Sequence, residues 1–457
     1  MQTVLISTYE LGRQPFGLAS PAAWLRQAGA RVTCLDLAVE RLDEEAIRAA
    51  GLVAFYVPMH TATRIATRVV ERVNTLNPNV HLCFYGLYAS MNEALLRSLG
   101  ADTVLGGEFE EGLLSLVKRL RASPGGARGV PQAEPLVSLA KQRFLVPDRS
   151  GLAALSKYAQ LELGDGQSRT VGYTEASRGC KHLCRHCPVV PVYQGQFRIV
   201  QQDVVLEDIR RQVAAGAQHI TFGDPDFFNG IGHAMALVQA LHAGHPHLTY
   251  DVTIKIEHLL KHAEHLEALK DTGCLFVTSA VESIDDRVLA LLDKGHTRED
   301  FIRVVHLCQE VGLILNPTFV AFTPWISVEG YQDLLSLLAE LDLIDQVAPI
   351  QLAIRLLIPA GSRLLELPEV RQMVEPFDEA AMVYPWRHPE PGVDQLQADV
   401  QALVHAAAAR GDSRREIFSQ VWLLAERASE GSSRPLPPTA QAPPRVTIPY
   451  LTEPWYC

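Results

Sequence analysis

Three cysteines lie close together in SRGCKHLCRHCPVVP, residues 177–191. Cys180, Cys184 and Cys187 are separated by three and then two residues, and the whole chain holds only eight cysteines. Thiolates are soft ligands suited to zinc or to iron–sulfur clusters. Structural clusters usually take four cysteines, so three thiolates on one loop can bind three irons of a [4Fe–4S] cluster and leave the fourth iron open. This set therefore predicts a cluster whose open iron binds another ligand.

The alternative for the same stretch is a zinc site, in which His182 or His186 adds a fourth ligand to the three cysteines. The elements around the cysteines distinguish the two alternatives. A position on a loop at the reactive rim of a barrel favours the cluster over the zinc site.

Residues 1 to about 120 predict an α/β domain with a doubly wound, Rossmann-like parallel sheet. Short apolar segments alternate there with segments of helical spacing, and this alternation is typical of parallel α/β domains. The expected strands are residues 3–7, 32–37, 52–57, 81–86 and 102–107.

The same alternation resumes near residue 171 and continues to about residue 370. The expected strands are residues 170–177, 219–224, 250–257, 274–282, 313–322 and 350–358. Six such units predict a partial (β/α)6 barrel of TIM type, whose reactive end is where strands hand over to loops. The three cysteines follow the first of these strands, so we expect them at the reactive rim.

Changes in composition divide the chain into five parts. We expect a Rossmann-like domain at 1–125, a linker at 126–165, the barrel at 166–370, a helical C-terminal region at 371–428, and a Pro-rich linker with a cysteine tail at 429–457.

Composition and charge narrow the function classes. The net charge is −11 and no long basic run is present, so a nucleic-acid partner is not favoured. The N-terminus MQTVLISTYELG lacks the pattern of a signal peptide, and no stretch approaches the ~20 apolar residues that a membrane helix needs. We therefore expect a cytoplasmic protein, in which clustered cysteines more often bind metal or catalyse than form disulfides.

Charged residues inside apolar strands are candidates for the barrel lumen. Lys255 and Glu257 share one strand face, opposite Ile254 and Ile256, and Arg355 lies in another apolar run. A core strand does not carry charge inward unless the charge is paired or binds a ligand. Lys255 and Glu257 are therefore catalytic candidates, and a solvated strand edge is the alternative.

The C-x3-C-x2-C spacing after the first barrel strand resembles that of the radical S-adenosylmethionine (SAM) superfamily. The resemblance implies that Cys180, Cys184 and Cys187 hold a [4Fe–4S] cluster, that SAM chelates the open iron, and that one electron from the reduced cluster cleaves SAM. It also implies that His186 packs against the adenine, and that a reductant such as flavodoxin or ferredoxin supplies the electron.

Matching segments imply further SAM contacts. FGDPDF takes the place of the family's glycine-rich motif, which implies Gly223 and Asp224 beside the SAM amino group, although the usual Gly-Gly-Glu is absent. SAVESIDDRVLALLDKGHT resembles the fourth-strand segment of cobalamin-type radical SAM proteins, which implies Glu282 and Ser283 near the ribose or the amino group. Arg355 is expected to pair with the SAM carboxylate, since its planar guanidinium suits bidentate contact.

The N-terminal domain resembles the cobalamin-binding domain that precedes such barrels. VLGGEFEEGLLSLV, residues 104–117, looks like the V-x-G-E-x-E stretch of that family. The D-x-H-x-x-G motif, which supplies a histidine below cobalt, is missing. Whether cobalamin binds stays open, and a bound cobalamin is expected to lack that histidine ligand. A scaffold without cobalamin is the alternative.

The sequence ends in LTEPWYC, with Cys457 as its last residue. This ending resembles the CUAEP/CCAEP-tail radical SAM family, whose tail reads Cys, then selenocysteine or cysteine, then Ala-Glu-Pro. The resemblance leads to the hypothesis that a selenocysteine codon translated as a stop truncates the chain there, which the gene sequence tests. We expect the tail to fold over the barrel mouth, with Cys457 as a catalytic candidate; a frayed terminus is the alternative.

The remaining cysteines and one group of histidines predict no chemistry. Cysteines in apolar segments are expected to be buried and inert; they are Cys34, Cys83, Cys274 and Cys308. His258, His262 and His265 fall on one helical face, which is expected to be solvated.

We interpret the sequence as that of a radical SAM enzyme that modifies a small molecule or peptide. Methyl transfer, 3-amino-3-carboxypropyl transfer and hydrogen abstraction all remain open. One alternative is a tRNA methylthiotransferase-like enzyme, a family that usually adds a basic RNA-binding domain and a second cysteine set. The other is a non-enzymatic zinc- or cobalamin-binding sensor module.

Overall fold

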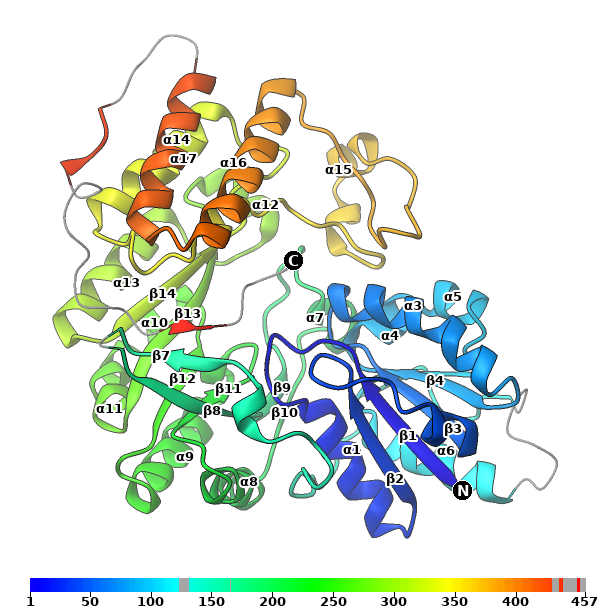
Figure 1. Ribbon diagram of the computed structural model, residues 1–457. Helices are drawn as coiled ribbons and strands as arrows, with labels where there is room; N and C mark the ends of the chain where they lie inside the picture. The colour runs from blue at the N-terminus through cyan, green and yellow to red at the C-terminus, as the bar shows by residue number, and fades with distance from the viewer. Residues whose placement is uncertain (123–130, 165, 430–434, 439–449, 453–457) are drawn as a thin grey trace.

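The computed structural model of the protein describes residues 1–122, 131–164, 166–429, 435–438 and 450–452. Figure 1 shows two α/β units side by side, an N-terminal unit in blue and cyan and a larger unit in green and yellow. The orange and red C-terminal helices cover one end of the larger unit (Figure 1).

The N-terminal unit is a six-stranded parallel sheet with the order β2-β1-β3-β4-β5-β6. Its strands are β1 (Gln2–Ser7), β2 (Arg31–Asp36), β3 (Ala50–Tyr56), β4 (His81–Tyr85), β5 (Thr103–Gly107) and β6 (Val137–Ser138). Its helices are α1 (Phe16–Gln27), α2 (Glu44–Ala49), α3 (His60–Leu76), α4 (Leu87–Met91), α5 (Glu93–Ser98) and α6 (Glu110–Ala122). The five predicted strands are confirmed, and their order is that of a doubly wound, flavodoxin-like sheet.

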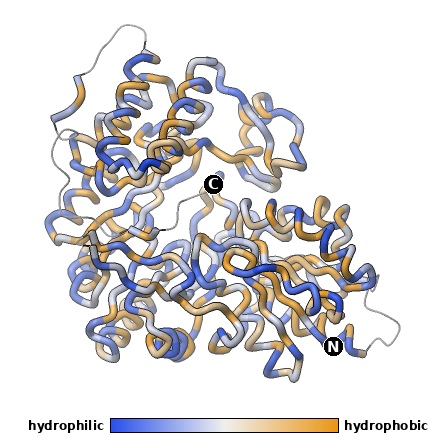
Figure 2. The backbone as a smooth tube through the Cα atoms, viewed as in Figure 1, coloured by the Kyte–Doolittle hydropathy of each residue, from blue (hydrophilic) through white to orange (hydrophobic). Residues whose placement is uncertain are grey.

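Strand β3 shows why this sheet forms. Its residues AGLVAFY are apolar almost throughout, as expected for a parallel strand covered on both faces. Leu52 and Tyr56 pack with α1 and α6 on one face, and Val53 and Phe55 pack with α2, α3 and α5 on the other. Figure 2 shows apolar residues along the central strands, while the covering helices alternate between apolar and polar residues.

The larger unit is a seven-stranded sheet with the order β14-β13-β12-β11-β8-β7-β15. Its strands are β7 (Gln160–Glu162), β8 (Ser168–Thr174), β11 (His219–Phe222), β12 (Thr249–Thr253), β13 (Cys274–Glu282), β14 (Ile314–Phe319) and β15 (Tyr450–Leu451). Five of them, β8 and β11 to β14, run parallel, and β7 and β15 are antiparallel additions at one edge. This sheet is the partial barrel that the sequence predicts.

The remaining elements surround this sheet. Strands β9 (Ser177–Gly179) and β10 (Phe197–Ile199) pair as a separate two-stranded antiparallel hairpin. The helices that follow the strands are α7 (Val189–Tyr193), α8 (Gln202–Ala214), α9 (Ile231–Gly244), α10 (Ile256–Lys261), α11 (Leu266–Asp271), α12 (Asp286–Leu292), α13 (Arg298–Val311) and α14 (Val328–Glu340). The C-terminal helices are α15 (Pro368–Met373), α16 (Pro391–Arg410) and α17 (Arg414–Ala428). The 3-10 turns are η1 (Leu155–Lys157), η2 (Phe227–Gly230), η3 (Ala263–His265), η4 (Pro349–Leu352) and η5 (Arg363–Glu366).

The sixth barrel strand, predicted at 350–358, is wrong as a regular strand. Residues Pro349–Leu352 form the turn η4, and only Arg355 makes a single parallel bridge, to Phe322. The side chain of Gln351 accepts a hydrogen bond from the Phe319 backbone N–H at 2.9 Å. That side chain takes the place of a backbone carbonyl at the end of β14, so the sixth barrel position holds one bridge in place of a ladder.

Four predicted barrel strands, β8, β11, β12 and β14, also end earlier than expected, and two of them bear on the site. Strand β8 ends at Thr174, and the chain then turns into the short β9. Strand β12 ends at Thr253, and Lys255 stands at the start of helix α10. Lys255 and Glu257 therefore lie at the carboxyl edge of the sheet instead of within a strand. No described helix is both long and apolar enough to cross a membrane.

Candidate functional site

The cysteine loop, residues 180–187, follows the first parallel strands of the partial barrel. Cys180 and Cys184 are buried, Cys187 is half-buried, and none of the three forms a disulfide. Backbone bonds shape the loop, with the Cys187 N–H donating to the Cys184 carbonyl at 3.2 Å. The predicted set of three free thiols on one loop is thus brought together.

Gly179 allows the chain to enter this loop. Its φ is +76°, and a Cβ there would lie 2.4 Å from Tyr193 Cδ1 and 2.5 Å from the Gln196 carbonyl oxygen. Only glycine fits such a left-handed position in close contact with backbone. The turn places Cys180 directly after β9, at the start of the segment that connects β9 to β10.

Two lysines lie close to the thiols. Lys255 Nζ lies 3.8 Å from Cys184 Sγ, and both groups are buried. Burial lowers the pKa of Lys294, but Glu282 and the thiols of Cys184 and Cys187 outweigh it and raise that pKa. Positive charge of this kind offsets the negative charge of thiolates that bind metal.

The thiols of Cys180 and Cys187 are held neutral when no metal is bound. Burial raises the pKa of Cys180, and burial together with the neighbouring Cys184 and Cys180 raises the pKa of Cys187 to about 12. Metal binding requires the thiolate form. The donor set fits a [4Fe–4S] cluster, because three thiols converge from one loop beside two cations.

His182 of the loop lies close to Asp226, and the sequence did not predict the two together. His182 Nε2 lies 3.5 Å from Asp226 Oδ2, and His182 Nδ1 lies 3.5 Å from Glu257 Oε2. Donor atoms of Cys180, His182 and Asp226 all lie within 4.8 Å of one another. These three residues could therefore hold a zinc ion. This set differs from the predicted zinc site, because Asp226 is present in place of Cys184 and Cys187.

The prediction of a solvated face for His258 is wrong. His258 is buried, and its Nδ1 lies 2.6 Å from Asp226 Oδ2. Because β12 ends early, the first turn of α10 faces the loop that carries Asp226. Burial raises the pKa of Asp226, but hydrogen bonds from His182 and His258 outweigh it and lower that pKa to about 2.

Two predicted SAM contacts, His186 and Glu282, lie together. His186 Nε2 lies 3.0 Å from Glu282 Oε1, and Lys294 Nζ lies 3.3 Å from the same oxygen. Burial raises the pKa of Glu282, but the nearby Lys294 and His186 outweigh burial and lower that pKa to about 2. His186 Nδ1 is buried without a hydrogen-bond partner among the described residues, so this cluster can accept a polar ligand.

Gly223 and Asp224 support the start of the loop. Asp224 accepts hydrogen bonds from the Ala176 N–H at 2.8 Å and from Ser177 Oγ at 2.5 Å. A Cβ on Gly223 would lie 1.8 Å from Tyr173 Oη. These residues therefore brace the turn before the cysteines, and their contact with SAM stays a prediction.

Arg355 and Ser283 have hydrogen-bond partners outside the cysteine loop. Arg355 donates to Asp394 and to the Trp386 carbonyl, both at 2.6 Å, and its guanidinium stacks on the Trp386 ring. The Ser283 hydroxyl accepts a bond from the Asp285 N–H at 3.1 Å. Cys457, with its predicted role, lies outside the described residues.

A cavity of about 180 Å³ lies between the two units. Both sheets present the carboxyl ends of their strands to it. Its wall includes Glu10, Tyr56 and Gly107 from the N-terminal unit, and Glu175, Gly179 and Gly223 from the barrel. No histidine is among the described residues that line it. The cavity therefore reaches the residue before Cys180 and offers no imidazole to a ligand.

Comparisons with known proteins match both units of the chain. Residues 174–340 match the model of the radical SAM superfamily, and residues 2–117 match that of the B12 binding domain. The barrel is therefore similar to the radical SAM superfamily, and the N-terminal unit is similar to the B12 binding domain. The cysteine loop lies within the matched radical SAM region, and the resemblance read from it is confirmed. Membership of the CUAEP/CCAEP-tail family stays a prediction.

Solved structures share the fold of this chain across both units. The cobalamin-dependent SAM radical enzyme OxsB with aqua-cobalamin bound has a TM-score of 0.71 and 13% identity, over 93% of this chain and 71% of that chain. The radical SAM methyltransferase TsrM from Kitasatospora setae has a TM-score of 0.59 and 19% identity, over 75% of this chain and 71% of that chain.

Curated relatives match only part of this chain and part of their own length. The tRNA-2-methylthio-N(6)-dimethylallyladenosine synthase of Desulfosudis oleivorans is 24% identical over 46% of this chain and 45% of its own length. The hopanoid C-3 methylase of Methylococcus capsulatus is 26% identical over 66% of this chain and 61% of its own length. The chain thus spans less than two-thirds of either relative.

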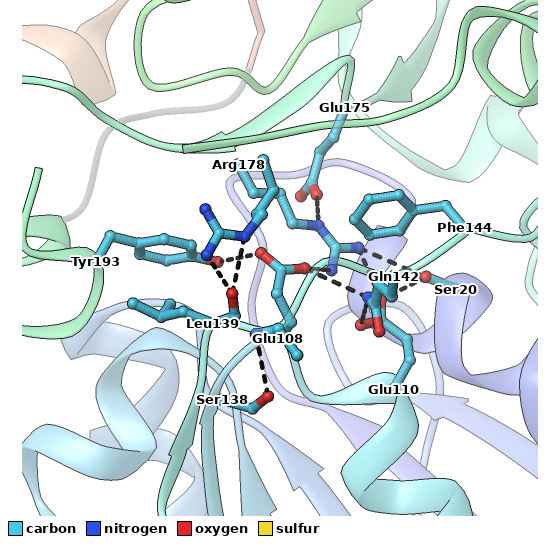
Figure 3. Close-up of polar contacts among 12 residues, drawn as sticks. Ser20, Glu108, Glu110, Ser138, Leu139, Gln142, Phe144, Glu175, Arg178 and Tyr193 are labelled. Atoms are coloured by element: carbon cyan, nitrogen blue, oxygen red, sulfur yellow. Dashed lines mark hydrogen bonds and ion pairs between the residues drawn. The ribbon is translucent and has the colours of Figure 1, made fainter. Parts of the chain in front are cut away.

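The residues that the sequence did not single out are polar partners from distant segments. Asp226 stands in the FGDPDF segment, where a second acidic residue was the available signal. Glu108 and Glu110 of the V-x-G-E-x-E stretch reach the barrel and contact Arg178 (Figure 3). No local pattern shows that contact, because its partners are far apart in the sequence.

Proposed function

We propose that this protein is an enzyme that reductively cleaves SAM at a [4Fe–4S] cluster and transfers a SAM-derived group to a small molecule or peptide. The observation that carries the proposal is the loop of three free thiols. This loop begins next to Gly179, which lines the cavity between the two units. The matches to the radical SAM and B12 binding domain models support it.

Cys180, Cys184 and Cys187 would hold the cluster, which, when bound, supplies the electron that cleaves the SAM sulfonium. Lys255 and Lys294 would balance the charge of the thiolates. We place SAM beside His186 and Glu282, since that buried pair has an unused ring nitrogen and a carboxylate. Lys255 and Glu257 remain our candidates for contact with the substrate.

Cobalamin is the cofactor that we place in the cavity between the units. Tyrosine and phenylalanine side chains, with backbone at three glycines, form much of the wall, and a flat ligand suits such a surface. OxsB binds cobalamin, TsrM is a methyltransferase, and one curated relative is a methylase. These relatives favour methyl transfer over 3-amino-3-carboxypropyl transfer and hydrogen abstraction.

The wider arrangement is part of the same proposal. We retain the division at 1–125, 126–165, 166–370, 371–428 and 429–457. A flavodoxin or ferredoxin would reduce the cluster in the cytoplasm, and neither a membrane nor a nucleic acid would take part.

Anaerobic reconstitution with iron, sulfide and cobalamin tests the function. We expect about four irons per chain, a broad visible absorption band and cleavage of SAM under strong reductant. Products of SAM separate the reactions: S-adenosylhomocysteine indicates methyl transfer, methylthioadenosine indicates aminocarboxypropyl transfer, and 5′-deoxyadenosine indicates the radical. A single bound zinc with intact SAM would support the sensor module and contradict the proposal.

A tRNA methylthiotransferase is the second candidate, because one curated relative carries that activity. Such enzymes usually add a second cysteine set in the N-terminal domain. Here the cysteines of that domain are Cys34 and Cys83, which lie in β2 and β4, and burial raises the pKa of both thiols. Two separate buried thiols do not form a second cluster site, so this candidate ranks below the first.

A further inference from the structure

Glu108 of the N-terminal unit bonds to residues on both sides of the cysteine loop. It stands in the turn between β5 and α6, and its side chain is buried. Arg178 Nη1 donates to Glu108 Oε2 at 3.1 Å, and Tyr193 Oη donates to Glu108 Oε1 at 3.1 Å (Figure 3). Arg178 precedes the loop by two residues, and Tyr193 follows Cys187 by six. One carboxylate therefore holds both flanks of the loop.

The Arg178 guanidinium is fixed from several directions. Glu110 Oε1 lies 2.8 Å from its Nη2, and Glu175 Oε2 lies 2.6 Å from its Nε. The rings of Phe16, Phe109 and Phe144 lie 5.0 to 5.5 Å from its carbon Cζ. The side chain is 7% exposed. A guanidinium in such a dry, crowded site exchanges its partners at high cost, so its position is well determined.

The contacts come from both units of the molecule. Glu108 and Glu110 belong to the N-terminal unit, while Glu175 and Tyr193 belong to the barrel (Figure 3). Arg178 and Tyr193 also line the cavity between the units, next to Gly179. A change in these bonds would therefore alter the cavity wall and the loop entrance together.

We infer that Glu108 is a positioning residue, which ties both ends of the cysteine loop to the N-terminal unit and so sets the distance between the cluster and the cavity. This gives a physical role to the V-x-G-E-x-E stretch. The role in cluster position rests on the proposed function, whereas the tie to the loop does not.

Three variants separate positioning from general stability. Glu108→Gln keeps the shape of the side chain but removes its charge toward Arg178. Tyr193→Phe removes only the bond on the far side of the loop. Glu134→Gln is the matched control, because Glu134 is a buried carboxylate whose ion-pair partner, Arg119 at 2.8 Å, lies within the N-terminal unit and outside the loop.

Hydrogen exchange on the metal-free full chain tests the tie. We expect backbone exchange in residues 176–194 to be about tenfold faster in Glu108→Gln, the effect of losing a bond to a charged group. In Tyr193→Phe the faster exchange should be confined to residues 188–194, and Glu134→Gln should leave the loop as in the natural protein. Equal exchange in Glu108→Gln and the natural protein, or an equal effect of Glu134→Gln on the loop, overturns the inference.

Spectra of the loaded enzyme then test cluster position. We expect Glu108→Gln to keep its iron while the electron paramagnetic resonance signal of the reduced cluster, and its shift on adding SAM, become broader than in Glu134→Gln. Identical signals in both variants overturn the role in cluster position. If the natural protein itself takes up no cluster, the proposed function fails with it, while the exchange data still decide whether Glu108 holds the loop.

Discussion

At the scale of single residues, the seven described cysteines fall into two kinds. Four lie within strands or a helix of the hydrophobic cores, and burial raises the pKa of each thiol; they are Cys34, Cys83, Cys274 and Cys308. The other three share one loop, where Lys255 and Lys294 lie near the thiols. Location beside cations, more than burial alone, distinguishes thiols that can bind metal.

Replacing one loop cysteine tests this distinction. We expect Cys184→Ala to lose most of its iron and all SAM cleavage after reconstitution, because only two of the three thiolate ligands remain to hold the cluster. Cys308→Ala is the matched control, since Cys308 is buried in helix α13 away from the loop. Iron and sulfide analysis measures the difference, and full iron content in Cys184→Ala would contradict our assignment.

At the scale of elements, strand β13 ends in a strained position that serves the site. Glu282 has a φ of +70°, an uncommon value for a residue other than glycine, and the register of β13 against β14 shifts there. The bend brings its carboxylate to His186 and Lys294. Backbone strain of this kind persists where surrounding contacts hold it, which is common at functional sites.

The buried pair of Glu282 and Lys294 gives a stability prediction. Glu282→Gln should lower the free energy of unfolding by about 3 kcal/mol, because it leaves the Lys294 ammonium buried without its carboxylate. Adding Lys294→Met to this variant should restore part of the loss. Urea unfolding of the metal-free protein measures both, and an additive double variant would show that the two side chains do not interact.

The short strand β15 connects the C-terminal segment to the barrel. Tyr450 and Leu451 pair with β7, and the Thr452 N–H donates to the Gln160 carbonyl at 2.9 Å. Arg414 of α17 also lies 5.1 Å from the Tyr450 ring centre. These contacts hold residues 450–452 against the barrel.

Shortening the chain tests that connection. A protein that ends after residue 449 should lose only about 1 to 2 kcal/mol of stability, since one two-residue strand and the packing of Leu451 are removed. Hydrogen exchange at residues 160–162 should accelerate, because β7 becomes the sheet edge. Unchanged exchange at those residues would show that β15 does not protect them in solution.

At the scale of the whole molecule, the two sheets face one cavity with the carboxyl ends of their strands. That edge is where parallel α/β units commonly bind ligands. The cavity wall carries Gly179, so a ligand there lies close to the start of the cysteine loop. This arrangement allows one bound group to meet both units.

Filling the cavity should block the cofactor without harming the cluster. Leu87 lines the cavity at the start of helix α4. We expect Leu87→Trp to bind cobalamin at least about tenfold more weakly, since the larger ring occupies the same space, while iron content stays unchanged. Leu423→Trp, on the exposed side of α17, is the control. Equal visible spectra after cobalamin loading would remove cobalamin from this cavity.

The parts predicted well are those encoded by local patterns. The first five N-terminal strands and the first five barrel strands follow from apolar runs between turn residues, although four of the latter end early. The errors occur where a side chain or a distant segment intervenes. Gln351 replaces a ladder bond, Asp226 draws His258 into the core, and Asp394 holds Arg355.

By itself the sequence determined the order of the elements and predicted the metal chemistry, because ligand type, spacing and hydrophobic periodicity are properties of neighbouring residues. Only the tertiary structure decided that Glu108 meets Arg178 and Tyr193, and that Glu282 meets His186 and Lys294. These contacts join segments that are far apart in the chain, and they depend on how whole sheets and helices pack. No short stretch of sequence contains that information.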